Sequence, residues 1–165
     1  MLKNDDKDLP WILHCGETTK GSNYNLIDAI QHDPKRIGHC LNLFKLGILS
    51  EYIKNKQIIL EINPISNQTL KQIRDLRIHP CIRYHNEGIK CTINNDDPTL
   101  YNTKGVKYDF LVVAAAMEFD LLDFKCFGLN SIDGAQISNQ MKNNYKYYFM
   151  KEWNNFLDYF INKYE

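Results

Sequence analysis

Four short apolar runs alternate along this chain with stretches of helical spacing, and this alternation limits the folds open to it. We expect strands near residues 10–15, 36–40, 57–62 and 89–94, and further helices over 106–119, 120–130 and 138–164. Strands that alternate with helices favour a parallel sheet with helical crossovers. The sheet is either a small open α/β sheet or part of a (β/α)₈ barrel, because a whole barrel needs roughly 250 residues.

Charge and hydropathy exclude two classes of partner. The 20 basic residues balance the 20 acidic ones, so the chain lacks the positive charge typical of nucleic-acid-binding proteins, and we expect no nucleic acid partner. No apolar stretch approaches the ~20 residues that span a bilayer, so we expect no membrane partner. Residues 1–8 are charged and lack the apolar segment of a signal peptide.

The cysteines do not form a metal-binding or disulfide pattern. None of the five is paired with another in a C-x-x-C motif, and their number is odd. We therefore expect buried free thiols, at Cys15, Cys40, Cys81, Cys91 and Cys126.

Polar and titratable residues follow each predicted strand. They lie in His14-Cys15-Gly16-Glu17, Arg36-Ile37-Gly38-His39, Glu61-Ile62-Asn63-Pro64-Ile65-Ser66-Asn67 and Asn95-Asp96-Asp97-Pro98. The carboxyl ends of parallel strands meet at one edge, where barrel enzymes carry their active sites. Imidazoles and carboxylates are also the groups that a metal-dependent hydrolase needs. We therefore expect convergence of five side chains, those of His14, Glu17, His39, Asp96 and Asp97.

In this order, the motifs resemble the C-terminal half of the adenosine deaminases, within the metal-dependent amidohydrolase barrels. The adenosine deaminase-related growth factor subfamily is the most similar, and the likeness also includes Asp75-Leu76-Arg77 before His79-Pro80, and Lys104-Gly105 before Tyr108-Asp109-Phe110. The resemblance implies that residues 1–165 are the C-terminal part of one catalytic domain, folded as the C-terminal half of a (β/α)₈ TIM barrel with added C-terminal helices. The N-terminal half of that barrel would be absent.

The resemblance implies a Zn²⁺ cofactor with His14 and Asp96 as ligands. The family's site also uses an H-x-H pair, and no two histidines of this chain are separated by one residue. A catalytic zinc usually has three protein ligands and a water. We therefore expect the missing half of the barrel, or a homodimer partner, to complete the site.

The resemblance also implies the roles of the remaining site residues. Glu17 would protonate N1 of the purine, and His39 would orient and deprotonate the attacking water and stabilise charge at the reacting carbon. Asp97 would bind N7, and Gly16 would let the ring approach the backbone. The implied reaction is hydrolytic deamination of adenosine or 2′-deoxyadenosine to inosine and ammonia, in an extracellular protein by subfamily resemblance.

Three substitutions depart from the family pattern. Cys40 stands where glycine is usual, Cys15 where alanine is usual, and Asn63 where cysteine is usual before Pro64. A positive φ at position 40 would strain a cysteine. Cys15 and Cys40 could alternatively be soft metal ligands.

Other interpretations stay open. The chain could be an inactive half-barrel or a partner-binding fragment without catalysis, and AMP deaminase or another amidohydrolase is a further alternative. We expect structural roles for Glu61, Ser66 and Asn67, and non-catalytic roles for three histidines, His32, His79 and His85. The aromatic residues of 143–164 predict a helix that packs on its own domain, or alternatively one that docks a partner or stacks on nucleic acid.

Overall fold

The computed structural model describes residues 10–18 and 24–164, which belong to two compact units. The first unit extends to Glu118 and contains a sheet with its helices. The second begins at Phe119 and is helical.

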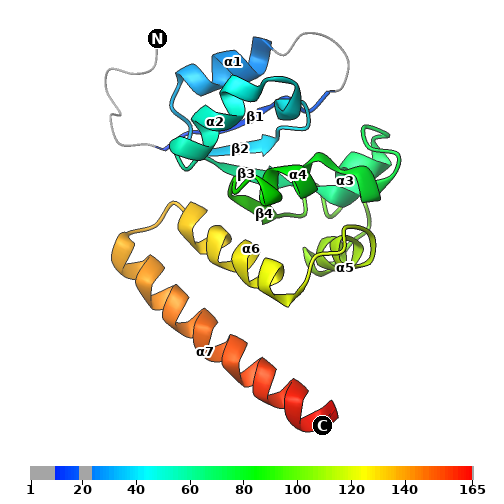
Figure 1. Ribbon diagram of the computed structural model, residues 1–165, viewed down its shortest axis with the longest axis vertical. Coiled ribbons are helices and arrows are strands. Elements are labelled where there is room, and N and C mark those ends of the chain that lie inside the picture. The colour runs from blue at the N-terminus through cyan, green and yellow to red at the C-terminus, as the bar shows by residue number, and fades with distance from the viewer. Residues whose placement is uncertain (1–9, 19–23, 165) are drawn as a thin grey trace. The chain divides into compact units, whose positions relative to one another are not determined.

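The first unit is built on a four-stranded parallel sheet (Figure 1). Its strands lie side by side in chain order and are β1 (Ile12–Cys15), β2 (Arg36–His39), β3 (Ile59–Ile62) and β4 (Cys91–Ile93). All three pairings are parallel. The four predicted strands and their orientation are therefore confirmed, and each is one to three residues shorter than expected.

Register brings one row of residues into line across the sheet. His14 is paired with Gly38, Gly38 with Glu61, and Glu61 with Thr92. Arg36 lies on the same face as Gly38, two residues earlier, and its Nε donates to Glu61 Oε1 at 2.7 Å. Glu61 thus pairs with a side chain of the neighbouring strand.

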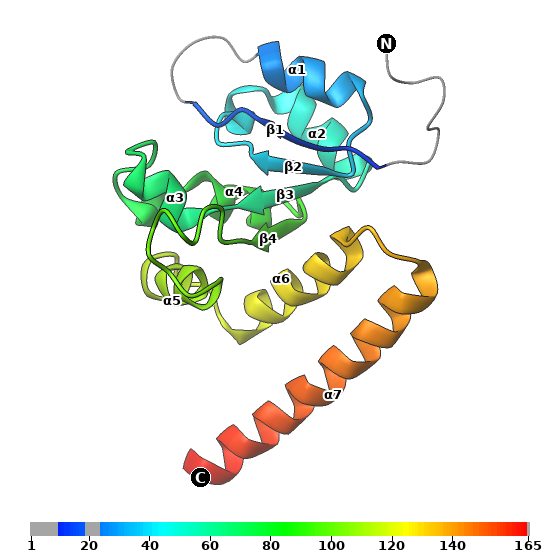
Figure 2. The same ribbon diagram turned by 180° about the vertical axis from the view of Figure 1, so that it is seen from behind.

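Five helices connect or follow the strands (Figures 1 and 2). They are α1 (Tyr24–Gln31), α2 (Gly47–Asn55), α3 (Pro64–Thr69), α4 (Pro80–Asn86) and α5 (Lys107–Ala116), with 3₁₀ turns at Leu43–Lys45 and Leu76–Ile78. Leu46 separates the first 3₁₀ turn from α2, because its φ of −127° is not helical. The helix α3 begins at Pro64, because proline suits the first position of a helix.

The core of this unit lies around the central strands. Ile37, Leu60 and Ile62 are almost fully buried. The Tyr84 hydroxyl donates to the carbonyls of Cys40 and Leu41 and accepts from the Phe44 amide, so α4 holds the segment that follows β2. The cysteines are free thiols as expected, four of them buried and Cys126 exposed.

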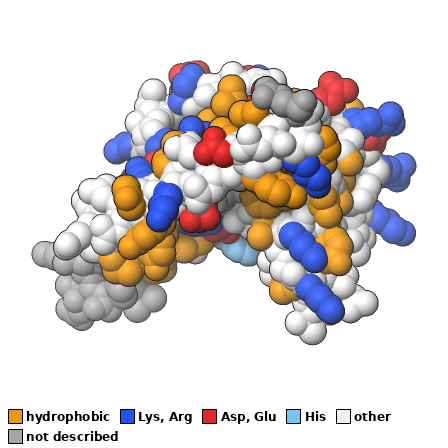
Figure 3. Space-filling view, turned by 90° about the horizontal axis from the view of Figure 1, so that it is seen from below, with side chains coloured by type: hydrophobic (Ala, Val, Ile, Leu, Met, Phe, Trp, Pro, Cys, Tyr) orange, Lys and Arg blue, Asp and Glu red, His pale blue; other side chains and the backbone are white. Residues whose placement is uncertain are grey.

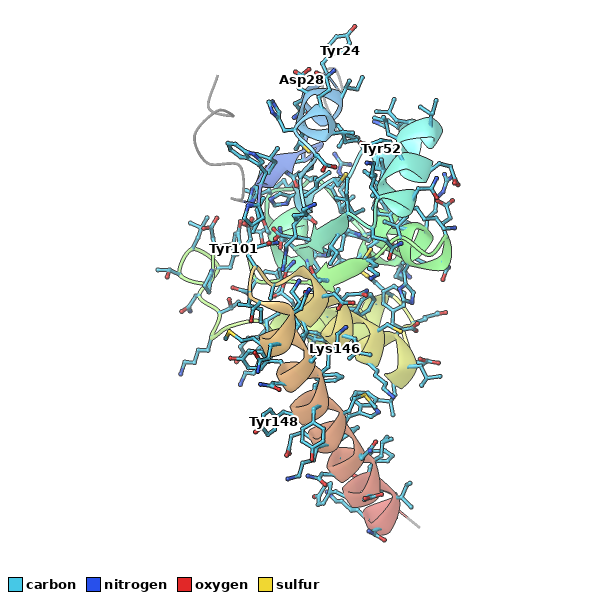
Figure 4. The ribbon with its side chains drawn as sticks, turned by 90° about the vertical axis from the view of Figure 1, so that its left-hand side faces the viewer. Tyr24, Asp28, Tyr52, Tyr101, Lys146 and Tyr148 are labelled. Carbon is cyan, nitrogen blue, oxygen red and sulfur yellow. The ribbon has the colours of Figure 1, made fainter. Side chains whose placement is uncertain are left out.

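The second unit is a pair of helices, α6 (Leu121–Gly134) and α7 (Asn139–Tyr164). Asp120 and Asp123 form a capping box that begins α6. The Phe149 ring lies so close to Gly128 that a Cβ there would be 2.6 Å from it. No residue of α7 is buried, and Tyr148 is one of its exposed aromatic residues (Figure 4). Within this unit α7 packs along α6, as expected for a helix that packs on its own domain.

Hydrophobic side chains are visible at several places on the face in Figure 3. None of the described helices combines the length and hydropathy needed to cross a lipid bilayer.

Candidate active site

His14 lies directly over Gly38 of the neighbouring strand. A Cβ at position 38 would be 2.5 Å from His14 Cδ2 and 2.9 Å from its Nε2. Glycine is therefore required at 38 for this position of the imidazole. The His14 ring also meets that of His39 edge-on, with 5.0 Å between centroids.

His39 is the residue around which the predicted site residues gather. Its Nε2 lies 3.8 Å from Glu17 Oε2 and 3.8 Å from Asp96 Oδ2, within electrostatic range but beyond a hydrogen bond. Three side chains from the ends of β1 and β4, those of His14, Glu17 and Asp96, therefore contact or face one imidazole at the end of β2. This is the edge at which the sequence predicts the site.

The backbone after β2 is unusual at two consecutive residues. His39 has a φ of 66° and Cys40 a φ of 54°, a region that L residues with a Cβ occupy at a cost. Cys40 is also fully buried. The strain expected for cysteine at this position is therefore present.

Glu17 is turned into the site by Gly16, whose φ is 63°. A Cβ on Gly16 would lie 3.4 Å from the Cys40 Cα, so the backbones of the two strand ends pass close together there. The Glu17 side chain is about one-third exposed. Its Oε1 accepts a hydrogen bond from Gln72 Nε2 at 3.0 Å.

Asp96 is oriented by a hydroxyl from the helix after β3. Ser66 Oγ donates to Asp96 Oδ2 at 2.8 Å. The same hydroxyl lies 3.0 Å from the Tyr101 hydroxyl, which comes from the loop after β4 (Figure 4). Asp97, the next residue, is exposed.

A buried carboxylate holds the loop that carries Asp96. Asp109 is 1% exposed and accepts from Asn95 Nδ2 at 2.6 Å and from the Ile65 amide at 3.3 Å. Burial raises the pKa of Asp109, an effect that these hydrogen bonds oppose. The loop after β4 is thus tied to both α3 and α5.

Burial lowers the pKa of His39, because the imidazolium is poorly solvated there. The charges of Glu17 and Asp96 act in the opposite direction. His39 is therefore a neutral imidazole at neutral pH, and a neutral imidazole carries its single proton on one of two nitrogens.

The cysteines beside the site are protonated thiols. Burial raises the pKa of Cys15 to about 12 and that of Cys40 well above its usual range. A metal ligand must be the thiolate, so burial disfavours the alternative in which these two residues bind a metal.

Sequence reasoning missed a set of polar residues behind His39. Asn63 Nδ2 and Asn67 Nδ2 each lie 3.3 Å from His39 Nδ1, and Asn67 also contacts His79 and Gln72. Asn67 is therefore more than a structural residue of α3. One signal was available: Asn63 and Asn67 are four residues apart, so the helix that begins at Pro64 places them on one face.

Among residues 10–18 and 24–164, no group of three or more His, Cys, Asp and Glu side chains could hold a metal ion. His14 and Asp96 are two donors of the types that zinc accepts, an imidazole and a carboxylate. The described part of the chain thus fits part of a metal site.

A cavity of about 730 Å³ lies in the first unit, and His79 is one of its lining residues. Its lining includes Leu41, Asn42, Phe44 and residues of α4, but none of His14, Glu17, His39 or Asp96. The polar side chains identify the candidate site, and this cavity does not.

Comparison with known proteins shows the family to which the chain belongs. The adenosine deaminase family model matches residues 3–147. Adenosine deaminase 2 of Dictyostelium discoideum is 39% identical over 157 residues, and that of Homo sapiens 35% over 159. The matches take in 94% and 93% of this chain but 29% and 31% of those proteins, so the chain spans about a third of their length.

Two solved structures share the fold. An adenine deaminase from Arthrobacter aurescens superposes with a TM-score of 0.81 at 23% identity, over 91% of this chain and 45% of its own. An amidohydrolase with bound zinc from Burkholderia ambifaria gives 0.82 at 21%, over 92% and 42%. The parallel sheet therefore corresponds to part of a deaminase barrel. Since the family model covers most of its length, the chain belongs to the adenosine deaminase family.

Proposed function

We propose that this chain carries part of the active site of a metal-dependent adenosine deaminase. The reaction is hydrolysis of adenosine or 2′-deoxyadenosine, with water adding at C6 and ammonia leaving to give inosine. One observation carries the proposal: Glu17 and Asp96 lie 3.8 Å from His39, whose ring meets that of His14. From the subfamily resemblance, we also propose that the protein acts outside the cell.

The metal in this proposal is zinc, with His14 and Asp96 as two of its ligands. An amidohydrolase of similar fold has zinc bound. When bound, zinc supplies a water that ionises near neutral pH. The hydrogen bond from Ser66 to Asp96 supports the assignment, because second-shell bonds orient ligating carboxylates. Residues of a longer chain, or of a partner chain, supply the other ligands.

The chain's own residues would bind and protonate the purine. Glu17, held by Gln72, donates a proton at N1. Asp97, exposed beside Asp96, binds at N7. Gly16 has no side chain that could block the purine ring. Its backbone also passes close to Cys40.

His39 can act in one of two ways, which differ in the position of its proton. With a free lone pair on Nε2, it accepts a proton from the attacking water. With a proton on Nε2, it donates a hydrogen bond to the reacting oxygen and stabilises negative charge there. Both roles are compatible with a neutral imidazole at this position.

An activity assay tests the proposal. The 165-residue chain, and a longer protein in which it is joined to a segment bearing an H-x-H pair, are supplied with zinc and adenosine. Loss of the adenosine absorbance is then followed. We expect turnover above the zinc control only in the longer protein, lowered about 10²–10⁴-fold by Glu17→Gln. Glu51→Gln, an exposed change on α2, is the matched control.

Three outcomes would overturn the proposal in different ways. If the longer protein has no activity, the chain is an inactive or partner-binding half-barrel. If it keeps its activity with Glu17→Gln, Glu17 is not the proton donor. If the 165 residues alone turn over adenosine and lose this activity with Glu17→Gln, two protein ligands are enough. The proposal that the metal site is incomplete would then be wrong.

A further inference from the structure

A network of hydrogen bonds behind His39 begins at a backbone amide. A backbone N–H can only donate, so the direction of this first hydrogen bond is known. We call His79, Asn67 and Gln72 the polar network. The Cys81 amide donates to His79 Nδ1 at 3.1 Å, because His79 is the N-cap of α4. A ring nitrogen that accepts a hydrogen bond carries no proton. His79 therefore holds its proton on Nε2.

The proton on His79 determines the orientation of the Asn67 amide. His79 Nε2 lies 3.1 Å from Asn67 Oδ1 and donates to it. The Nδ2 of Asn67 must then face the other way, where it donates to Gln72 Oε1 at 3.1 Å. Both His79 and Asn67 are buried, with 2% and 0% exposed, so water does not compete for these bonds.

The same amide determines the position of the proton on His39. Asn67 Nδ2 lies 3.3 Å from His39 Nδ1 and can only donate to it. His39 Nδ1 is then the acceptor, so the proton of the neutral ring lies on Nε2. That nitrogen faces Glu17 and Asp96, whose carboxylates attract an N–H.

The other branch of the network reaches the proposed acid. Gln72 Oε1 accepts from Asn67, so Gln72 Nε2 is free to donate, and it does so to Glu17 Oε1. One amide thus orients both an imidazole and a carboxylate of the site. Burial lowers the pKa of His79 to about 4, which keeps it neutral as the network requires.

We propose that His79 and Asn67 are positioning residues that hold His39 as its Nε2-protonated tautomer and, through Gln72, anchor Glu17. The tautomer follows from the hydrogen bonds alone, whereas its catalytic use rests on the proposed function. In that use, His39 donates a hydrogen bond to the reacting oxygen, and the role of proton acceptor at Nε2 is excluded in the resting state.

Asn63 is the other residue that could determine the tautomer of His39. Its Nδ2 also lies 3.3 Å from His39 Nδ1, but it is 3.5 Å from Nε2, so it contacts both nitrogens and selects neither. An experiment on the tautomer must therefore separate Asn63 from Asn67.

Histidine-¹⁵N labelling of the 165-residue chain reads the tautomer directly. Long-range ¹H–¹⁵N correlation spectra distinguish a protonated from an unprotonated ring nitrogen, and His39→Gln and His79→Gln assign the signals. We expect both His39 and His79 to be protonated on Nε2. In Asn67→Asp the carboxylate accepts from both rings, so His39 should gain a proton on Nδ1 while His79 is unchanged. Asn63→Ala should leave both rings unchanged.

A second pair of variants keeps the test decisive if Asn67→Asp does not fold. His79→Gln retains an N–H near the Nε2 position and should preserve the His39 tautomer. His79→Leu removes it, frees the Asn67 amide to turn, and should give a mixture. A wild-type His39 protonated on Nδ1 would overturn the proposal. So would a tautomer that changes with Asn63→Ala but with none of the Asn67 and His79 variants.

Kinetics of the longer protein test the catalytic use. We expect Asn67→Asp and His79→Leu to lower kcat about 10–100-fold with KM little changed, and His79→Gln to restore most of it. Equal activity of Asn67→Asp and the wild type would overturn the positioning role. If the longer protein has no deaminase activity at all, the proposed function fails, and the spectra still decide the tautomer.

Discussion

At the scale of single residues, the site depends on a backbone conformation that residues with a Cβ do not favour. His39 and Cys40 both have positive φ, and Cys40 is fully buried. Strained backbone of this kind often occurs at functional sites, where the surrounding fold holds it in place. Here Tyr84 does so by donating to the carbonyls of Cys40 and Leu41.

Substitution at Cys40 should reveal the strain. Cys40→Ala and Cys40→Gly both remove the buried sulfur, but only glycine relieves the positive φ. We expect the glycine variant to be about 1 kcal/mol more stable than the alanine variant in urea unfolding. Cys91 is the matched control, because it is equally buried and its φ is not positive. There the alanine variant should be the more stable, and a glycine preference at both sites would argue against strain at Cys40.

His79 should make stability depend on pH. Its pKa is about 4 in the folded chain and 6.5 in the unfolded chain. Below pH 6.5 the unfolded state therefore binds a proton that the folded state does not. Stability should fall as the pH drops from 6.5 towards 4, by about 3 kcal/mol in all.

Urea unfolding at pH 7.5 and 4.5 measures this contribution. The free energy of unfolding should fall less for His79→Gln than for the wild type between these two values. His32→Gln, at an exposed histidine, should follow the wild type. Equal pH dependence of His79→Gln and the wild type would contradict the low pKa.

Sequence could predict the site residues that end strands, but not those that support them. His14, Glu17, His39 and Asp96 follow apolar runs, and parallel strands end at one edge. Their grouping around His39 was therefore accessible from the pattern. The contacts of Asn67 with His39, Gln72 and His79 depend on how α3 and α4 pack, over separations of up to 28 residues. No local pattern contains that information.

At the scale of elements, short apolar runs were sufficient to locate the strands. The sequence did not show where helices begin and break. Gly88, with a φ of 80°, lies just after α4, where glycine commonly follows the end of a helix. The sequence does not reveal α3, because Pro64 closely follows a strand and also begins a helix. Proline favours both positions, so its local sequence does not decide between them.

The packing of β1 against β2 should not tolerate a side chain at position 38. In Gly38→Ala the new Cβ would be 2.5 Å from the His14 ring, so we expect a loss of about 1–3 kcal/mol in the free energy of unfolding. Adding His14→Ala should recover most of it. Gly47→Ala is the control, because nothing lies within 4 Å of a Cβ there. A Gly38→Ala loss that His14→Ala does not reduce would show that the clash is with another group.

At the scale of the whole molecule, the chain contains two metal-ligand candidates, whereas a catalytic zinc usually has three protein ligands. The described residues include no group of three possible ligands. The chain spans about a third of the relatives that it matches. Both facts are consistent with a site that other residues complete.

Zinc should therefore bind the 165-residue chain weakly. Two protein ligands cannot hold a catalytic zinc firmly. We therefore expect calorimetry to give a zinc dissociation constant at least about 10²-fold larger for this chain than for the longer protein. His14→Ala should weaken the longer protein's affinity, and His32→Ala should not. Equal affinity of the two proteins would show that the described residues form a complete site.

The division into two units has a consequence for optical measurements. The chain has two tryptophans, Trp11 at the start of the sheet unit and Trp153 within α7. Each unit therefore contains one tryptophan. Trp11 is 38% exposed near His32, whereas Trp153 is stacked on Phe149 with 6.1 Å between ring centroids. Their emission differs in environment, so replacing either with phenylalanine lets the melting of one unit be followed separately from that of the other.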